Sequence, residues 1–151
     1  MICILRAMAL TTDRHKGAAS VQGWAPFALG FRPFFLLGAL AAVLLMVVWT
    51  LLWHGVLAAP AHYDPVAWHG HEMLFGYTVA VIAGFLLTAV RNWTGIQTWT
   101  GPRLAMLAAL WLLGRLLPWI PGVPAVLVVA VDVAFLPLVL ISLVQIGRAH
   151  V

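Results

Sequence analysis

Four long apolar runs, separated by short polar segments, restrict the fold of this chain more than any other feature. The runs cover about residues 34–53, 71–90, 104–117 and 123–144. A helix of about 20 apolar residues is long enough to cross the hydrocarbon core of a bilayer. We therefore predict an all-α fold, a polytopic transmembrane helical bundle of about four spans, with the lipid bilayer as its surroundings.

The composition excludes several other classes of protein. Of the 151 residues, 64% are hydrophobic and 8% are charged, whereas soluble domains have about 25% charged residues. The net charge of +4 comes from scattered basic residues rather than from a basic patch, so we predict no nucleic-acid binding. The single cysteine, Cys3, excludes a disulfide within the chain and a cysteine-based metal site.

The positive charges predict how the spans are oriented. They lie before the first run and between the second and third runs, whereas the other two loops contain no Lys or Arg. The positive-inside rule then places both termini in the cytoplasm and the first loop on the outer side of a multi-pass protein. The residues concerned are Arg14, Lys16, Arg32, Arg91 and Arg103.

The two ends of the chain differ from its apolar centre. Residues 1–23 are mixed and weakly patterned, which predicts a cytoplasmic tail, and residues 24–145 form the membrane region. Residues 146–151 back-translate readily into a common sequencing-adapter read, so we interpret them as a non-native tail. We expect the chain to be truncated relative to a longer parent.

Histidines gather where the second apolar run begins. His69, His71 and Glu72 lie together there, and His54 and His62 precede them in the first loop. Imidazole is a common ligand for copper and for haem iron. We predict His69 and His71 as cofactor ligands and His69, His71 and Glu72 as metal ligands, with His54 and His62 as weaker candidates.

Helix geometry limits how these ligands combine. Residues two apart on a regular helix point about 200° apart, so His69 and His71 diverge, whereas His69 and Glu72 can share a face. If Gly70 interrupts the helix, the two histidines converge instead. A simpler interpretation is that these histidines cap helix ends and contact headgroups. The start of the zinc-protease pattern H-E-x-x-H occurs at His71, but Phe75 replaces its second histidine and excludes that site.

Three charged residues fall inside predicted membrane segments, where a charge at a helix centre costs about 2.5–3.5 kcal/mol and usually has a function. Glu72 and Arg115 lie near the outer ends of their spans and can pair. Asp132 lies near the middle of the fourth run, which contains no cation. It is interpreted as a proton-relay group, as a partner for another helix, or as a buried protonated carboxyl.

Small and aromatic residues predict packing and depth in the membrane. Gly76, Ala80 and Gly84 recur every four residues, a spacing that lets helices approach closely. The tryptophans are predicted to be interfacial anchors, and only Trp68 is placed to stack beside a cofactor. The tryptophans concerned are Trp49, Trp53, Trp68, Trp93, Trp99, Trp111 and Trp119.

Three segments of the chain resemble the NnrS family. They are Gly30–Phe35 (GFRPFF), Trp68–Gly76 (WHGHEMLFG), which follows the pair Asp64-Pro65, and Ala83–Gly95 (AGFLLTAVRNWTG). The resemblance extends over about residues 26–138, which corresponds to the first third of a family of about twelve spans. One departure is Arg91, where the family often has proline.

The resemblance implies a bacterial inner-membrane protein that contains haem and copper and is associated with denitrification and relief of nitric-oxide stress. It implies that His69 and His71 are the natural ligand candidates, that nitric oxide is a possible small-molecule ligand, and that the remaining spans of the parent are partners. It names no reaction.

Two other functions are compatible with the residues. In a transporter or channel, Glu72, Arg115 and Asp132 would line a pathway, and the Gly and Pro interruptions fit transporter helices. In a non-catalytic membrane subunit, the histidines would contact only a partner. Measuring haem and copper content would distinguish the NnrS-like protein from both alternatives. Measuring ion or substrate flux would distinguish the transporter from the non-catalytic subunit.

Overall fold

The computed structural model describes Phe27 and residues 31–147, and this part of the chain contains helices but no strands. The whole of the predicted tail at 1–23 and all but two residues of the predicted non-native tail at 146–151 lie outside the described residues. The helices are α2 (Phe31–Trp53), α3 (Pro65–His71), the π-helix η2 (Glu72–Thr78), α4 (Val79–Thr94), α5 (Gly101–Leu116), the short 3₁₀ helix η3 (Leu117–Trp119) and α6 (Ala125–Gly147). The prediction of an all-helical membrane bundle is confirmed.

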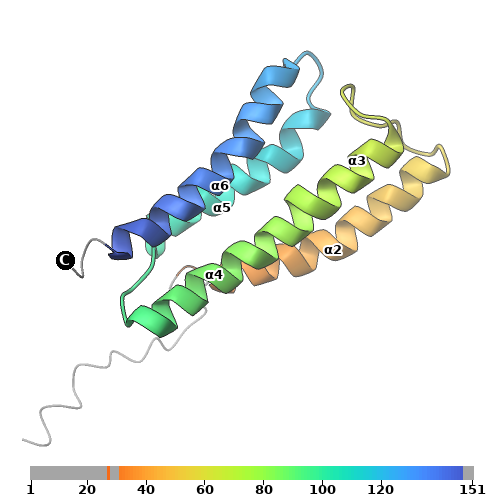
Figure 1. Ribbon diagram of the computed structural model, residues 1–151. Coiled ribbons are helices and arrows are strands. Elements are labelled where there is room, and N and C mark those ends of the chain that lie inside the picture. Colours follow the sequence, from red (N-terminus) through yellow and green to blue (C-terminus); the bar gives the residue numbers. More distant parts are fainter. Residues whose placement is uncertain (1–26, 28–30, 148–151) are drawn as a thin grey trace, which may run out of the picture.

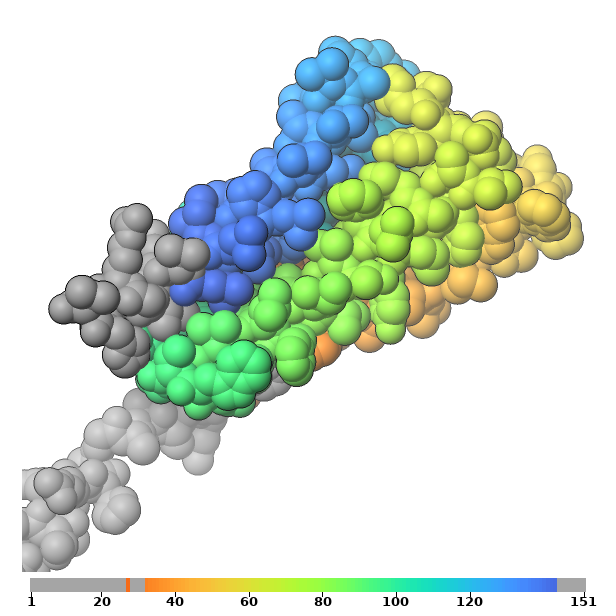
Figure 2. Space-filling model, in the orientation of Figure 1, coloured from red at the N-terminus to blue at the C-terminus, as the bar shows by residue number. Residues whose placement is uncertain are grey.

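The helices form two antiparallel hairpins that lie along each other (Figure 1). Helix α2 packs against the continuous helix formed by α3, η2 and α4, and α5 packs against α6. Figure 2 shows α4 and α6 on the same face of the elongated molecule. The first and third loops meet at one end, where the Nε2 atom of His62 lies 2.8 Å from the carbonyl oxygen of Val123. This agrees with the predicted alternation of loops, although which side of a membrane they occupy stays a prediction.

The number of full-length spans differs from the prediction. Within the described part of the chain, three helices are long and apolar enough to cross a membrane: Arg32–Trp53, Pro65–Thr94 and Ala125–Leu143. Helix α5 has 16 residues and extends about 24 Å at 1.5 Å per residue, which is less than the hydrocarbon thickness of about 30 Å. Pro118, in the 3₁₀ turn that follows it, ends the helix. Thus α5 is a fourth helix of the bundle but not a full span by length.

The second long helix begins earlier than predicted. Asp64 caps it, because its Oδ1 atom accepts a hydrogen bond from the backbone N–H of Ala67 at 2.9 Å, and Pro65 follows at a position where proline is favoured. The helix therefore runs through Gly70 without interruption. The segment 65–70, predicted as loop or helix start, is the first two turns of the helix.

Small residues let the two helices of the first hairpin approach closely. A Cβ atom added at Gly84 would lie 3.2 Å from the Cβ of Phe34, and one added at Gly38 would lie 3.9 Å from the Cβ of Ala80. Helices α2 and α4 thus pack across the predicted stripe of small residues. Large apolar side chains are exposed on the outer faces, including Val43 and Val126, the latter 80% exposed. In a bilayer these faces are available to lipid and to other membrane helices.

Candidate functional site

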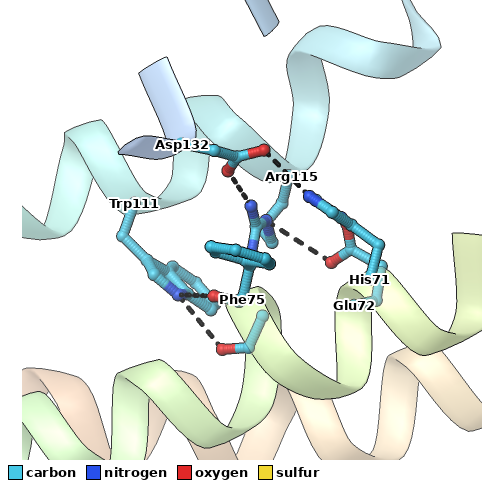
Figure 3. Close-up of polar contacts among 7 residues, drawn as sticks. His71, Glu72, Phe75, Trp111, Arg115 and Asp132 are labelled. Carbon is cyan, nitrogen blue, oxygen red and sulfur yellow. Dashed lines mark hydrogen bonds and ion pairs between the residues drawn. The ribbon is translucent and has the colours of Figure 1, made fainter. Parts of the chain in front are cut away.

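Four polar side chains meet inside the bundle and form what we call the charge cluster: His71, Glu72, Arg115 and Asp132 (Figure 3). They come from both hairpins, since His71 and Glu72 lie at the junction of α3 and η2, Arg115 on α5 and Asp132 on α6. Glu72 is 1% exposed, Asp132 8% and Arg115 9%. Burial of this kind is tolerated only when the charges are paired.

The contacts of the charge cluster form a closed ring. The guanidinium of Arg115 donates a hydrogen bond from Nη2 to Oδ1 of Asp132, and its Nε atom lies 3.4 Å from Oε2 of Glu72. The Nδ1 atom of His71 lies 3.2 Å from Oε1 of Glu72, and its Nε2 atom lies 3.1 Å from Oδ2 of Asp132. Because a neutral imidazole has one N–H, the ring of His71 donates to both carboxylates only as an imidazolium. In that form the two positive and two negative charges balance.

Two glycines make room for these side chains. A Cβ atom added at Gly76 would lie 2.8 Å from Oε2 of Glu72 and 3.5 Å from Cδ of Arg115. A Cβ atom added at Gly114 would lie 2.5 Å from Oδ1 of Asp132. The glycine at each position therefore allows a charged side chain to lie directly against a helix backbone. Gly76 was predicted only as a helix-packing residue, and Gly114 was not singled out.

A π-helical segment begins at Glu72, at the centre of the site. Its wider turns are shown by the backbone N–H of Val79, which donates to the carbonyl of Leu74, five residues earlier. The indole N–H of Trp111 donates to the carbonyls of Phe75 and Gly76, at 3.2 and 3.1 Å. Short π-helical segments are often found at functional sites. Apart from Gly76, the sequence contains no clear signal for this segment.

Trp111 also contacts the charge cluster directly. The Cζ atom of Arg115 lies 5.9 Å from the centre of its indole ring, a distance compatible with a cation–π interaction. The side chain is buried. Trp111 is therefore a core residue that supports the site, and its prediction as an interfacial anchor is wrong, because α5 turns this position inward.

The two central histidines point to different places, as the helical spacing predicts. The ring of His69 stacks on that of Trp49 of α2, with centroids 4.3 Å apart, whereas His71 faces the second hairpin. Since the helix continues through Gly70, the alternative in which both histidines converge is excluded. His69 and Glu72 do not act together, because Glu72 pairs with His71 and Arg115.

The other predicted polar residues have clear positions. The pairing of Glu72 with Arg115 is confirmed at 3.4 Å, and Asp132 finds its cation on α5 rather than in its own helix. His54 is exposed at the end of α2, and His62 is exposed and contacts the loop before α6. Neither belongs to the charge cluster.

Tyr63 is a neighbour of the site that was not predicted from the sequence. Its ring centroid lies 5.0 Å from that of His71. Partial burial raises the pKa of Tyr63 above its ordinary value of 10.0, and the negative charges of Asp132 and Glu72 raise it further, while Arg115 opposes them. The phenol is therefore held in its neutral form next to the cluster.

The described residues are less suited to binding copper than to binding haem. Among the described residues, no group of three His, Cys, Asp or Glu side chains is arranged to hold a metal ion. Both ring nitrogens of His71 face carboxylates, so the predicted set of His69, His71 and Glu72 does not fit copper. In contrast, the Nδ1 atom of His69 is buried and has no hydrogen-bond partner within the described part of the chain. One histidine is enough to hold a haem iron on one side, so of the two central histidines only His69 remains a candidate haem ligand.

Comparison with known proteins supports the resemblance seen in the sequence. A family model described as NnrS protein matches residues 25–150, which include all four residues of the charge cluster. No curated protein and no solved structure matches the chain.

Proposed function

Because this chain belongs to the NnrS family, we propose that it is a bacterial inner-membrane protein that protects the cell against nitric oxide, the reactive gas formed during denitrification. Three helices of membrane-spanning length support the membrane setting. Nitric oxide is small and uncharged and dissolves in lipid, so a protein embedded in the bilayer would meet it there.

The observation that carries this proposal is the charge cluster inside the bundle. Charges within a membrane protein are costly and are usually kept for a function. Reduction of a nitrogen oxide consumes protons as well as electrons. The ring of His71, which lies between carboxylate oxygens of Glu72 and Asp132 at 3.2 and 3.1 Å, is placed to hold a proton away from water, and Arg115 offsets the charge of the two carboxylates.

His69 is the residue we propose as the haem ligand. Bound haem would supply an iron that binds nitric oxide and exchanges electrons. His69 would hold the group, and Trp49, whose ring stacks on that of His69, would fix the orientation of the imidazole. Both ring nitrogens of His71 face carboxylates, so we assign His71 to holding the proton and not to binding haem. We assign no copper ligand among the described residues.

The visible absorption spectrum of the purified chain, prepared with haem supplied, tests this assignment. We expect a Soret band that is lost in His69→Ala and kept in His71→Ala, and His54→Ala, at an exposed position, is the matched control. Far-UV circular dichroism checks that each variant is folded. A chain that takes up no haem, or a Soret band unchanged in His69→Ala, would contradict the assignment.

The protective role is tested in cells. We expect deletion of the gene to lengthen the growth lag after exposure to a nitric-oxide donor, and we expect the wild-type gene to restore growth. A plasmid carrying Arg115→Ala should fail to restore it, because the charge cluster loses the cation that pairs with both carboxylates. Equal growth of the deletion and parent strains would contradict the proposal.

A proton-coupled transporter is the second candidate, and a specific observation favours it. The charge cluster lies at a π-helical segment and joins two hairpins that pack as separate pairs, an arrangement in which one hairpin can move against the other. Purified protein in vesicles with a pH-sensitive dye inside tests this function. Proton flux that Asp132→Asn abolishes would favour transport, and its absence would leave nitric-oxide protection as the function.

A further inference from the structure

A cavity of about 300 Å³ lies between α2, the junction of α3 and η2, and α5. Leucines of α2 and α5 are the largest group among its lining residues, and Trp68, Glu72 and Arg115 also line it. Small-molecule sites occupy about 300–1,000 Å³, are mainly apolar with a few placed polar groups, and often lie between the helices of a bundle. This cavity has each of these properties.

Two buried hydrogen-bond donors in the lining lack an acceptor. Trp68 is 1% exposed, and its indole N–H has no hydrogen-bond partner in the described part of the chain. The Nη1 atom of Arg115 is also buried and without a partner there. Trp111, which lines the same cavity, has its N–H occupied by backbone carbonyls. Both nitrogen atoms are covered by their neighbours. Because buried donors are normally paired, a ligand that brings an acceptor into the cavity would give them a partner when the two side chains turn toward it.

The charges at the cavity favour a neutral ligand. The guanidinium of Arg115 already pairs with the carboxylates of Glu72 and Asp132. An anionic ligand would lie close to these carboxylates without an additional cation to balance it, and the remaining walls are apolar. A neutral carbonyl oxygen, in contrast, accepts hydrogen bonds without adding a charge.

The aromatic lining favours a flat ring. Trp68, Trp111 and Trp119 all line the cavity, and the rings of Trp68 and Trp119 meet edge to face with centroids 5.7 Å apart. Aromatic rings pack favourably against one another in stacked and edge-to-face arrangements. An acyl ester carbonyl would satisfy the donors but would make no use of these rings.

The cavity has lipid-facing side chains at its edge. Leu40 and Leu44 of α2 and Leu112 and Leu116 of α5 line it, and all four are exposed on the outside of the bundle. Where no further helix covers these leucines they are open to acyl chains, and a lipophilic molecule can enter there between α2 and α5 without crossing water.

We propose that this cavity binds a neutral, lipophilic carbonyl compound of the quinone class, with one carbonyl oxygen accepting hydrogen bonds from Nε1 of Trp68 and Nη1 of Arg115. The ring lies among the tryptophans, and the apolar tail extends past the leucines into the bilayer. The site is separate from His69, whose side chain stacks on Trp49. Binding at this site therefore does not depend on haem.

The experiment is a binding titration of the whole chain in lipid nanodiscs with decylubiquinone as the probe. Saturable binding of one molecule is expected. Trp68→Phe keeps the ring but removes the donor, and should weaken binding about fivefold, the effect of one hydrogen bond. Trp93→Phe is the matched control, because Trp93 is 77% exposed and does not line the cavity, and it should bind like the wild type.

Blocking the cavity provides a second arm. Ala41→Leu fills the buried wall and Leu44→Trp covers the edge, and both should reduce binding at least tenfold. Ala109→Leu, at an exposed position of α5, is the control. Because Leu44 is 60% exposed, its variant is expected to fold even if Ala41→Leu does not.

The probes also separate the possible occupants. Methyl decanoate, which has a carbonyl and a tail but no ring, should bind at least tenfold more weakly than decylubiquinone. Equal binding would assign the cavity to lipid esters and overturn the quinone class. Absence of saturable decylubiquinone binding, or equal binding in the wild type and Leu44→Trp, would overturn the site itself.

Discussion

The Nε2 atom of His71 lies 3.1 Å from Oδ2 of Asp132, and this contact connects the first helical hairpin to the last helix of the second. The ion pair between Arg115 and Glu72 crosses the same boundary. Elsewhere the hairpins meet mainly through apolar side chains such as Phe34 and Phe135, whose rings are 5.7 Å apart. The charge cluster and the hydrogen bonds from Trp111 to Phe75 and Gly76 therefore fix the relative position of the hairpins, because hydrogen bonds are directional and apolar contacts are not.

Asp132→Asn should destabilise the protein substantially. It removes the carboxylate that pairs with both Arg115 and His71, and breaking one side of a buried ion pair costs about 3–5 kcal/mol. The measurement is the free energy of unfolding in mixed SDS micelles, followed by far-UV circular dichroism. Asp64→Asn is the control, because asparagine caps a helix as well as aspartate does. A loss below about 1 kcal/mol in Asp132→Asn would show that the network adds little to stability.

Gly76→Ala and Gly70→Ala should have opposite effects although both glycines lie in the same continuous helix. The new Cβ at position 76 would lie 2.8 Å from Oε2 of Glu72 and 3.2 Å from Cδ1 of Leu45, whereas at position 70 nothing lies within 4 Å. Overpacking costs about 1–3 kcal/mol, while alanine in place of an unconstrained helical glycine gains up to about 1 kcal/mol. Unfolding in mixed micelles measures both, and equal effects would contradict the close packing at Gly76.

The fold was largely predictable because the apolar runs and their breaks are local signals. The errors concern where one helix begins, which depends on its N-cap, and whether another helix is long enough to span a membrane. Asp64 and Pro65 form a helix start, but the predicted helix began at His71, where the apolar run begins. The 16 residues of α5 read as a span because they are apolar, although the helix is too short to cross a bilayer alone.

The site was predictable only in part, because it is assembled from residues distant in sequence. Glu72 and Arg115 were paired correctly from their similar depth in the membrane. The partners of Asp132 could not be derived, since they depend on how the second hairpin packs against the first. The role of Trp111 likewise depends on backbone carbonyls in a π-helix, which residue types do not reveal.

Trp111→Phe should loosen the π-helical segment while leaving the helices in place. The substitution removes the N–H that donates to the carbonyls of Phe75 and Gly76, and the loss of such a bond costs about 1 kcal/mol. Hydrogen exchange should accelerate at the amides of residues 72–79 and remain unchanged in α6. Trp93→Phe, at an exposed tryptophan, is the control, and unchanged exchange at η2 in Trp111→Phe would contradict this role.

The ionisation of Tyr63 should make the protein less stable at high pH. Burial and the charges of Asp132 and Glu72 raise the pKa of Tyr63 above 10.0, so the folded state binds the phenolic proton more tightly than the unfolded state does. This contribution to stability is complete below pH 10 and is lost as the pH rises through the higher pKa of the folded protein. Tyr63→Phe should therefore lose less stability than the wild type above pH 10.

The absorbance of tyrosinate near 295 nm measures this ionisation directly. The chain has two tyrosines, so in a Tyr77→Phe background the signal comes from Tyr63 alone. The midpoint should lie above 10.0 in the folded protein and should fall when Asp132→Asn removes one of the two negative charges that raise it. The Asp64→Asn variant should leave the midpoint unchanged, because Asp64 is not among the charges that shift this pKa. A midpoint at or below 10.0 would show that Tyr63 is not held next to the carboxylates, and would place the first loop away from the charge cluster.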